Sequence, residues 1–184
     1  MSHLLFPPPE MKVLGWGDVD TSGKVWRVTI QRNYVKAVWK CTKEAGRDRT
    51  IEISEKAREV LARMRPLTQL LPALDVEVLQ SDNQTIVDET IRPVFRNSVS
   101  GNVWNDASNE RVFKAICRKA GIDERGPNQC RHTFASQLLT QGVPLEFIAR
   151  MMGHADVEMI KKHYGRFITA DNAGNDAALL NQYQ

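Results

Sequence analysis

The sequence has few cysteines, no long apolar run and no secretory signal. Its three cysteines, Cys41, Cys117 and Cys130, lack the C-x-x-C spacing of metal sites, and an odd count favours reduced thiols over a closed disulfide set. No run of about 18 apolar residues occurs, so we expect no membrane-spanning helix. The N-terminal stretch MSHLLFPPPE lacks the basic and apolar regions of a secretory signal. We therefore expect a cytoplasmic protein.

The net charge is only +3 over 184 residues, but the charge is unevenly distributed. Residues 111–166 contain ten Lys and Arg against five Asp and Glu, a local charge of +5. The other residues contain 15 basic and 17 acidic side chains, a local charge of −2. This asymmetry fits a polyanionic partner, and it fits a solvated helical surface equally well.

The first third of the chain predicts β-structure. A short helix at residues 8–15 opens on prolines, and residues 24–53 are then rich in Val, Ile, Thr, Tyr and Trp. Turn signals at residues 32–33 and 45–46 divide this segment into three strands. We expect an antiparallel three-stranded sheet with strands near residues 24–31, 34–41 and 48–53.

The remaining chain predicts mostly helices. Ser54 can cap a helix with apolar residues at i, i+3, i+4 and i+7, and Pro66 is its expected stop. Residues 67–100 show no sustained period and predict loop with short helical or extended pieces. Further helices are expected at residues 106–120, 127–141, 144–152 and 156–164, with glycine at most of their ends. The predicted fold class is α+β, mostly helical, with a small three-stranded antiparallel sheet on one side.

Residues 126–166, GPNQCRHTFASQLLTQGVPLEFIARMMGHADVEMIKKHYGR, contain the side chains best suited to chemistry. With Pro127 as the first helical residue, Asn128 and Arg131 lie three residues apart, so both can reach one ligand such as a phosphate. His154 follows a glycine that ends a helix, and Tyr164 comes ten residues later. Taken singly, an arginine on a helix surface is usually a solvated charge, and a tyrosine at such a position is normally a core-edge residue.

The order of these features resembles the catalytic half of tyrosine recombinases, the phage integrase family. In sequence order the features are R-H-T-F-A-S, L-L-x-x-G, an apolar helix, M-G-H, and a tyrosine with basic neighbours. Upstream, E-M-K-V-L-G-W-G-D-V-D (10–20) is similar to the family's E-x-x-x-L-x-W-x-D-I-D segment. T-K-E-A-G-R-D-R-T-I-E-I (42–53) is similar to its K-T-x-x-S-x-R hairpin. The resemblance covers roughly residues 10–170 and implies the recombinase catalytic fold.

The resemblance also implies roles for individual residues. Tyr164 corresponds to the nucleophile that attacks a DNA phosphodiester, giving a 3′-phosphotyrosine and a free 5′-hydroxyl without ATP. Arg131 corresponds to the second catalytic arginine, and His154 to a position occupied by His or Trp; both contact phosphate oxygens. Lys43 corresponds to a hairpin lysine that protonates the leaving oxygen, and Asn128 stands where His or Lys is usual. The implied DNA-binding residues are Arg131, His132, Lys161, Lys162 and Arg166, and no cofactor or metal is implied.

The sequence departs from the family pattern at its N-terminus. The family's first catalytic arginine lies three residues before the glutamate that matches Glu10, and that position is Pro7. Losing one phosphate-clamping arginine predicts a rate lower by about 10² to 10³. The chain also begins later than the family's catalytic domain, so we expect N-terminal truncation. Residues 1–166 would be a partial catalytic domain, and residues 167–184 a tail that docks on a neighbouring protomer or folds back.

Several alternatives remain at this point. The expected partner is double-stranded DNA at attachment or recombination sites, bound by a homotetramer that is a monomer without DNA, with no membrane involved. A non-catalytic DNA-binding relic of an integrase is the main alternative function, and a type IB topoisomerase-like activity is another. A zinc site made by Cys130, His132, His154 and His163 is disfavoured, because residues two apart on a helix point to different sides.

Overall fold

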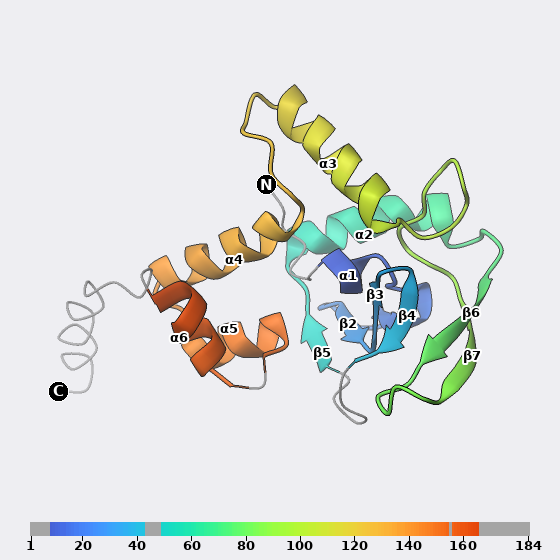
Figure 1. Ribbon diagram of the computed structural model, residues 1–184, viewed down its shortest axis with the longest axis horizontal. Helices are drawn as coiled ribbons and strands as arrows, with labels where there is room; N and C mark the ends of the chain where they lie inside the picture. Colours follow the sequence, from blue (N-terminus) through green and yellow to red (C-terminus); the bar gives the residue numbers. More distant parts are fainter. Residues whose placement is uncertain (1–7, 43–48, 155, 166–184) are drawn as a thin grey trace. The chain divides into compact units, whose positions relative to one another are not determined.

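The structure, a computed structural model, describes residues 8–42, 49–154 and 156–165. The chain forms two compact units, Met1–Asn128 and Gln129–Gln184, and Figure 1 labels their helices and strands. The first unit contains every strand found in the described residues, together with helices, and the second is helical. The predicted α+β class is therefore confirmed. None of the helices in the described ranges is long and apolar enough to cross a membrane.

The first unit contains a three-stranded antiparallel sheet in the order β1-β2-β5, but it is not built from the three predicted strands. β2 and β5 fall within the predicted strands 24–31 and 48–53, whereas the third strand is β1 at residues 19–20 and not the predicted strand 34–41. Val28 of β2 lies opposite Ile51 of β5, and both side chains are buried. Because alternate residues of a strand point to opposite faces, this register directs one face of the sheet into the core. The strands are β1 (Val19–Asp20), β2 (Arg27–Ile30) and β5 (Arg49–Glu52).

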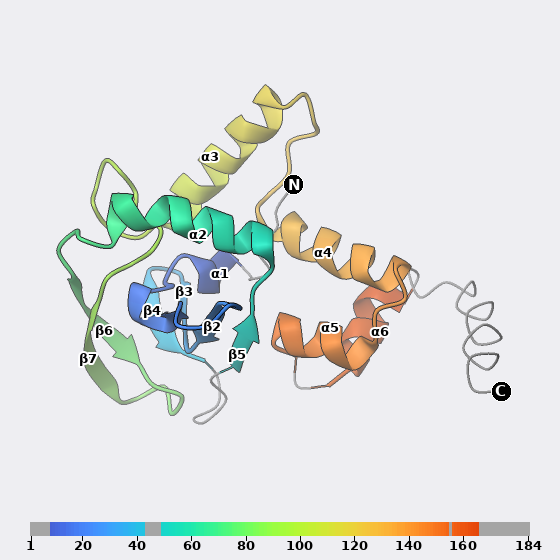
Figure 2. The ribbon, with the colours of Figure 1, turned by 180° about the vertical axis from the view of Figure 1, so that it is seen from behind.

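A second sheet was not predicted. Its order is β3-β4-β6-β7, with β4 and β6 parallel and the other pairs antiparallel. Figure 2 shows β6 and β7 side by side as an extended hairpin. For residues 67–100 the prediction was loop with short helical or extended pieces, and the extended pieces are two paired six-residue strands. The strands are β3 (Arg32–Val35), β4 (Val38–Cys41), β6 (Leu74–Leu79) and β7 (Ile86–Ile91).

The turn predicted at residues 32–33 was also misplaced. The chain reverses instead at Lys36 and Ala37, whose φ angles are 51° and 63°, so the predicted strand 34–41 is two strands of a hairpin. Positive φ at both central residues matches the twist that a two-residue hairpin needs, but Lys and Ala seldom adopt it. The turn therefore lacks the Gly or Asn that would have predicted it.

The first unit also contains helices, and α2 contributes Ala57 and Leu61 to its core. The helices are α1 (Pro8–Met11), α2 (Glu55–Thr68), α3 (Asp106–Lys119) and the short 3-10 helix η1 (Trp16–Asp18). Ser54 caps α2 by accepting a hydrogen bond from the amide of Ala57 at 3.3 Å, as predicted. The predicted stop at Pro66 was wrong, because α2 continues to Thr68. A proline in the last turn removes only one helical hydrogen bond, and the Gln69 amide still donates to the Arg65 carbonyl at 3.1 Å.

The segment at residues 10–20 forms a buried framework. The Asp18 carboxylate accepts hydrogen bonds from the Gly15 amide at 2.8 Å and from Arg32 at 2.6 Å. The Trp16 indole donates to the Thr68 hydroxyl at 3.0 Å, which ties η1 to the end of α2. Space beside Gly15 is tight, since a Cβ there would lie 3.0 Å from Ile91 Cγ2, and that side chain would have to shift. This motif therefore stabilises the first unit through buried polar contacts.

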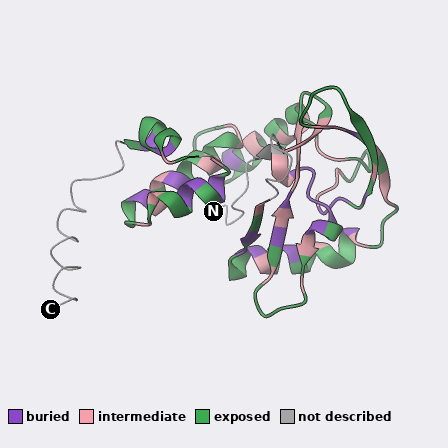
Figure 3. Ribbon diagram, turned by 90° about the horizontal axis from the view of Figure 1, so that it is seen from below, coloured by how far each residue is buried: buried purple, intermediate pink, exposed green. Residues whose placement is uncertain are grey.

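In its described residues, the second unit has three helices around a small apolar core. They are α4 (Asn128–Thr140), which begins at the last residue of the first unit, α5 (Leu145–Met152) and α6 (Glu158–Tyr164). Figure 3 shows buried and exposed faces alternating along these helices. The predicted helices of the C-terminal half are confirmed to within a few residues. The core side chains are Ala135, Leu139, Ile148, Ala149, Met152, Ile160 and Tyr164.

Candidate active site

The end of α5 places His154. Gly153 follows the last residue of α5 in the left-handed conformation, with φ 70° and ψ 32°. The His154 amide then donates a hydrogen bond to the Ala149 carbonyl at 2.9 Å, which is the Schellman arrangement that ends many helices. The backbone of His154 is thus fixed by the helix terminus, and a non-glycine residue at position 153 would strain it.

Arg131 of α4 contacts both this helix end and His154. Its Nη2 donates to the Met152 carbonyl oxygen at 2.9 Å, and it lies 2.9 Å from Nε2 of His154. The carbonyls of the last helical turn carry partial negative charge, so a guanidinium is favourable there. Because a guanidinium only donates, Nε2 of His154 accepts, and the imidazole proton lies on Nδ1. One charged and one neutral nitrogen group therefore lie together at the C-terminus of α5.

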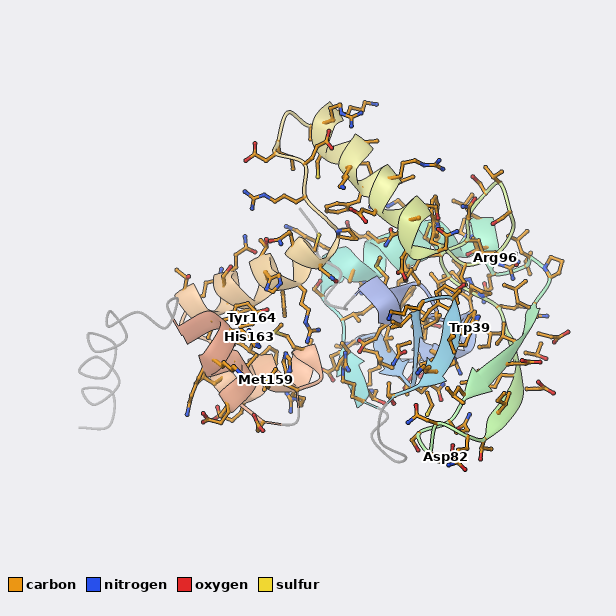
Figure 4. The ribbon with its side chains drawn as sticks, in the orientation of Figure 1. Trp39, Asp82, Arg96, Met159, His163 and Tyr164 are labelled. Atoms are coloured by element: carbon orange, nitrogen blue, oxygen red, sulfur yellow. The ribbon has the colours of Figure 1, made fainter. Side chains whose placement is uncertain are left out.

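Tyr164 lies at the last residue of α6 with its ring in the core. The residue is only 4% exposed, and Ile160, one turn earlier, is fully buried. The phenol oxygen lies 2.9 Å from Nδ1 of His132, and the two ring centroids are 5.6 Å apart with an interplanar angle of 47°. Figure 4 shows Tyr164 beside His163 on α6. His132 follows Arg131 on α4, so the phenol hydroxyl contacts the turn of α4 that also carries the Arg131 guanidinium.

Burial raises the pKa of Tyr164 above its usual value of 10.0. The positive charge of Arg131 acts in the opposite direction, but it is the smaller effect. The phenol is therefore neutral at physiological pH. If it is to act as a nucleophile, its proton must pass to another group as the new bond forms.

The other candidate residues have different environments. Asn128 is exposed as the first residue of α4, three residues before Arg131. Lys161 and Lys162 are exposed on α6, and Lys161 pairs with Glu158 at 2.9 Å, which raises the lysine pKa. Lys43, Arg166 and Pro7 lie outside the described residues, as does the predicted tail 167–184. Among the described residues, no group of three His, Cys, Asp or Glu side chains could hold a metal ion.

Two contacts were missed by sequence reasoning. In the first unit, Arg49 forms an ion pair with Glu10, and one of its hydrogen bonds measures 3.1 Å. Both side chains are more than four-fifths buried, which links the two upstream motifs. In the second unit, the hydrogen bond between His132 and Tyr164 joins residues 32 positions apart. The opposite charges at positions 10 and 49 could have suggested the ion pair from the sequence. The contact between His132 and the phenol could not have been predicted in this way, because it depends on tertiary packing.

Solved structures identify the class of fold. The chain superimposes on the crystal structure of XerA recombinase with a TM-score of 0.62 and 20% identity, covering 98% of this chain and 51% of that one. A structure of the Tn1549 transposon integrase in complex with transposon right end DNA gives a TM-score of 0.72 at 15% identity, covering 99% and 56%. The fold is that of a tyrosine recombinase catalytic domain.

Sequence comparison then identifies the family. The chain is 32% identical over 181 residues to the putative defective protein IntQ of Escherichia coli K12, covering 95% of this chain and 45% of the relative. It is 28% identical over 177 residues to the prophage integrase IntR of the same strain, covering 94% and 42%. The sequence model of the phage integrase family matches residues 8–168, so the chain belongs to this family. It spans less than half the length of these two relatives.

Proposed function

We propose that this chain is a catalytic part of a site-specific DNA recombinase that cleaves and rejoins DNA through a 3′-phosphotyrosine on Tyr164. The observation that carries the proposal is the position of the Tyr164 hydroxyl, hydrogen-bonded to His132 on the helix turn that also bears Arg131. Arg131 in turn contacts His154 at 2.9 Å. A nucleophile and a cationic oxyanion partner thus occupy one small helical unit.

In the proposed reaction the Tyr164 oxygen attacks a DNA phosphorus in line with the leaving 5′-oxygen. Arg131 and His154 stabilise the charge that develops on the non-bridging oxygens. Lys43 donates a proton to the leaving oxygen, and Asn128 donates a hydrogen bond where the family usually has a titratable side chain. The phosphotyrosine bond conserves the energy of the phosphodiester, so rejoining requires no ATP.

The DNA partner would be held mainly through its phosphates. Lys161 and Lys162 present two exposed cations on α6, and Arg166 adds a third basic residue close behind in sequence. Such contacts fix orientation without reading bases, and they weaken as salt rises. We further propose a homotetramer on paired DNA sites, a monomer without DNA, and residues 167–184 as the segment that joins protomers.

Pro7 limits the activity that we propose. Without an arginine at this position, part of the charge on the transferred phosphate lacks a partner, so cleavage should be slower by about 10² to 10³ than in a chain that has one. One relative in Escherichia coli K12 is itself named a putative defective protein. The test must therefore detect slow, single-turnover cleavage.

Covalent trapping on nicked suicide duplexes tests the proposal. The protein is incubated without metal with a labelled pool of candidate attachment sequences and analysed on a denaturing gel, beside Tyr164→Phe as the matched control. The expected result is a shifted band that the control lacks. If a pool that demonstrably binds the protein gives no band, the chain is a DNA-binding relic, and a Pro7→Arg variant then tests whether this position is the cause.

A further inference from the structure

His132 is an exposed residue whose imidazole contacts the buried hydroxyl of Tyr164. Its Nδ1 lies 2.9 Å from the Tyr164 oxygen, while the residue as a whole is exposed to solvent. The phenol, in contrast, is 4% exposed. One nitrogen of the imidazole therefore contacts a buried hydroxyl, although the residue that carries it is exposed.

This geometry gives the buried phenol a route for its proton. The tautomer with hydrogen on Nε2 leaves a lone pair on Nδ1, so the phenol donates and the imidazole accepts. A base already hydrogen-bonded to the nucleophile can take the proton as the new bond forms, and a free phenolate need never accumulate. Because His132 is an exposed residue, the imidazolium can then release a proton to water.

No other described group near the phenol has the same relation to it. Arg131, also on α4, is a permanent cation and cannot accept a proton. His154, after α5, has its Nε2 engaged by Arg131 at 2.9 Å. His163, on α6 itself, has its ring centroid 6.4 Å from that of Tyr164, with no hydrogen bond between the two side chains in this structure. These contacts leave His132 as the base with direct access to the Tyr164 oxygen.

We propose that His132 is the general base for Tyr164, accepting the phenol proton at Nδ1 during DNA cleavage and returning it during rejoining. In cleavage, the Oη–H bond breaks towards Nδ1, the Oη–P bond forms and the bond from phosphorus to the 5′-oxygen breaks. The leaving oxygen takes its proton from Lys43 or water. This inference rests on the proposed function, and it assigns His132 to the nucleophile in place of a DNA contact.

The hydrogen bond is tested first, without DNA. In protein labelled with ¹⁵N-histidine, Tyr164→Phe should shift the Nδ1 resonance of His132 and leave His163 nearly unchanged, because only His132 bonds to the hydroxyl. Removing the hydroxyl keeps the aromatic ring in the core, so the fold is retained. Equal and small effects on both histidines would overturn the inference.

The proton transfer is tested by single-turnover trapping over a pH range at saturating DNA. The key variant is His132→Asn, whose side chain can retain a hydrogen bond near the Nδ1 position but cannot accept a proton, and His163→Asn is the matched control. We expect His132→Asn to lower the cleavage rate about 10² to 10³-fold near neutral pH. The loss should shrink as the pH rises, because hydroxide can then remove the phenol proton.

The outcomes separate this inference from the proposed function. If wild type forms a Tyr164-dependent adduct and His132→Asn cleaves at the same rate, or slower by a factor that does not change with pH, His132 is not the base and the recombinase proposal stands. If wild type forms no adduct while DNA is bound, both proposals fail together. A rate loss in His163→Asn equal to that in His132→Asn would also overturn the specific assignment.

Discussion

Arg131 should stabilise the second unit, independently of its proposed contact with DNA. Its Nη2 bonds to the Met152 carbonyl and to His154, each at 2.9 Å, in a half-buried position. Hydrogen bonds that involve a charged group contribute roughly 1.5–3 kcal/mol each when well shielded, and partial exposure reduces this value. We therefore expect Arg131→Ala to lower the free energy of unfolding by about 2–4 kcal/mol.

Arg150→Ala is the matched control, because Arg150 is an exposed arginine of α5 whose guanidinium lies over the Phe147 ring at 5.4 Å. It should cost about 1 kcal/mol or less.

The assay must report on the correct unit. All four tryptophans, Trp16, Trp26, Trp39 and Trp104, lie in the first unit, so tryptophan fluorescence follows that unit alone. Urea unfolding should therefore be followed by far-ultraviolet circular dichroism together with hydrogen exchange of the Ile148 and Met152 amides in α5. The exchange of these amides should accelerate in Arg131→Ala while the fluorescence transition stays in place. Equal stability losses in Arg131→Ala and Arg150→Ala would refute the capping role.

Three further predictions concern single side chains. Gly153→Ala should destabilise the second unit by about 1–2 kcal/mol, because a Cβ is unfavourable at φ 70°, and Gly153→Asn should cost less; equal losses in urea unfolding would contradict this strain argument. The folded-state pKa of Tyr164 lies above its unfolded value, so its contribution to stability is fully present below about pH 10 and is lost as the pH rises through the raised pKa. Unfolding of wild type should therefore show a steeper alkaline loss of stability than Tyr164→Phe, and parallel curves would count against burial as the cause. Asp18→Ala should cost about 2–3 kcal/mol in the fluorescence transition, because it removes the buried carboxylate that accepts hydrogen bonds from Arg32 and from the Gly15 amide. Arg32 keeps its ion pair with Glu89 at 2.7 Å, which limits the loss, and a cost below about 1 kcal/mol would be inconsistent with the buried pair.

The sequence predicted the helical half of the fold better than the β-rich half. Gly121, Gly142 and Gly153 end their helices with φ of 67°, 73° and 70°, and glycine is the residue that this conformation selects. The hairpin turn at Lys36 and Ala37 uses the same region of φ without glycine, so no local signal located it. The β6 strand has a short alternation, L-D-V-E-V, that could have been recognised, but β7 begins with exposed Ile86 and Val87 and breaks the pattern.

The candidate site was predictable as a set of residues but not as a set of contacts. Arg131, His154 and Tyr164 stand out because their order and spacing resemble a family pattern. The bond from Arg131 to the Met152 carbonyl depends on how α4 packs on α5, and that from His132 to the phenol depends on how α4 packs on α6. Such partners are set by tertiary packing, which local periodicity does not encode.

The cap that Arg131 places on α5 affects how the sequences of related proteins should be interpreted. A residue that closes a helix end is retained for as long as the protein must fold, whether or not any DNA is cut. A phenol hydroxyl contributes far less to folding, since phenylalanine fills the same space. An arginine at this position is therefore weak evidence that a related protein cleaves DNA. A tyrosine at the position of Tyr164 is stronger evidence, because its hydroxyl is needed for the proposed reaction and not for the fold.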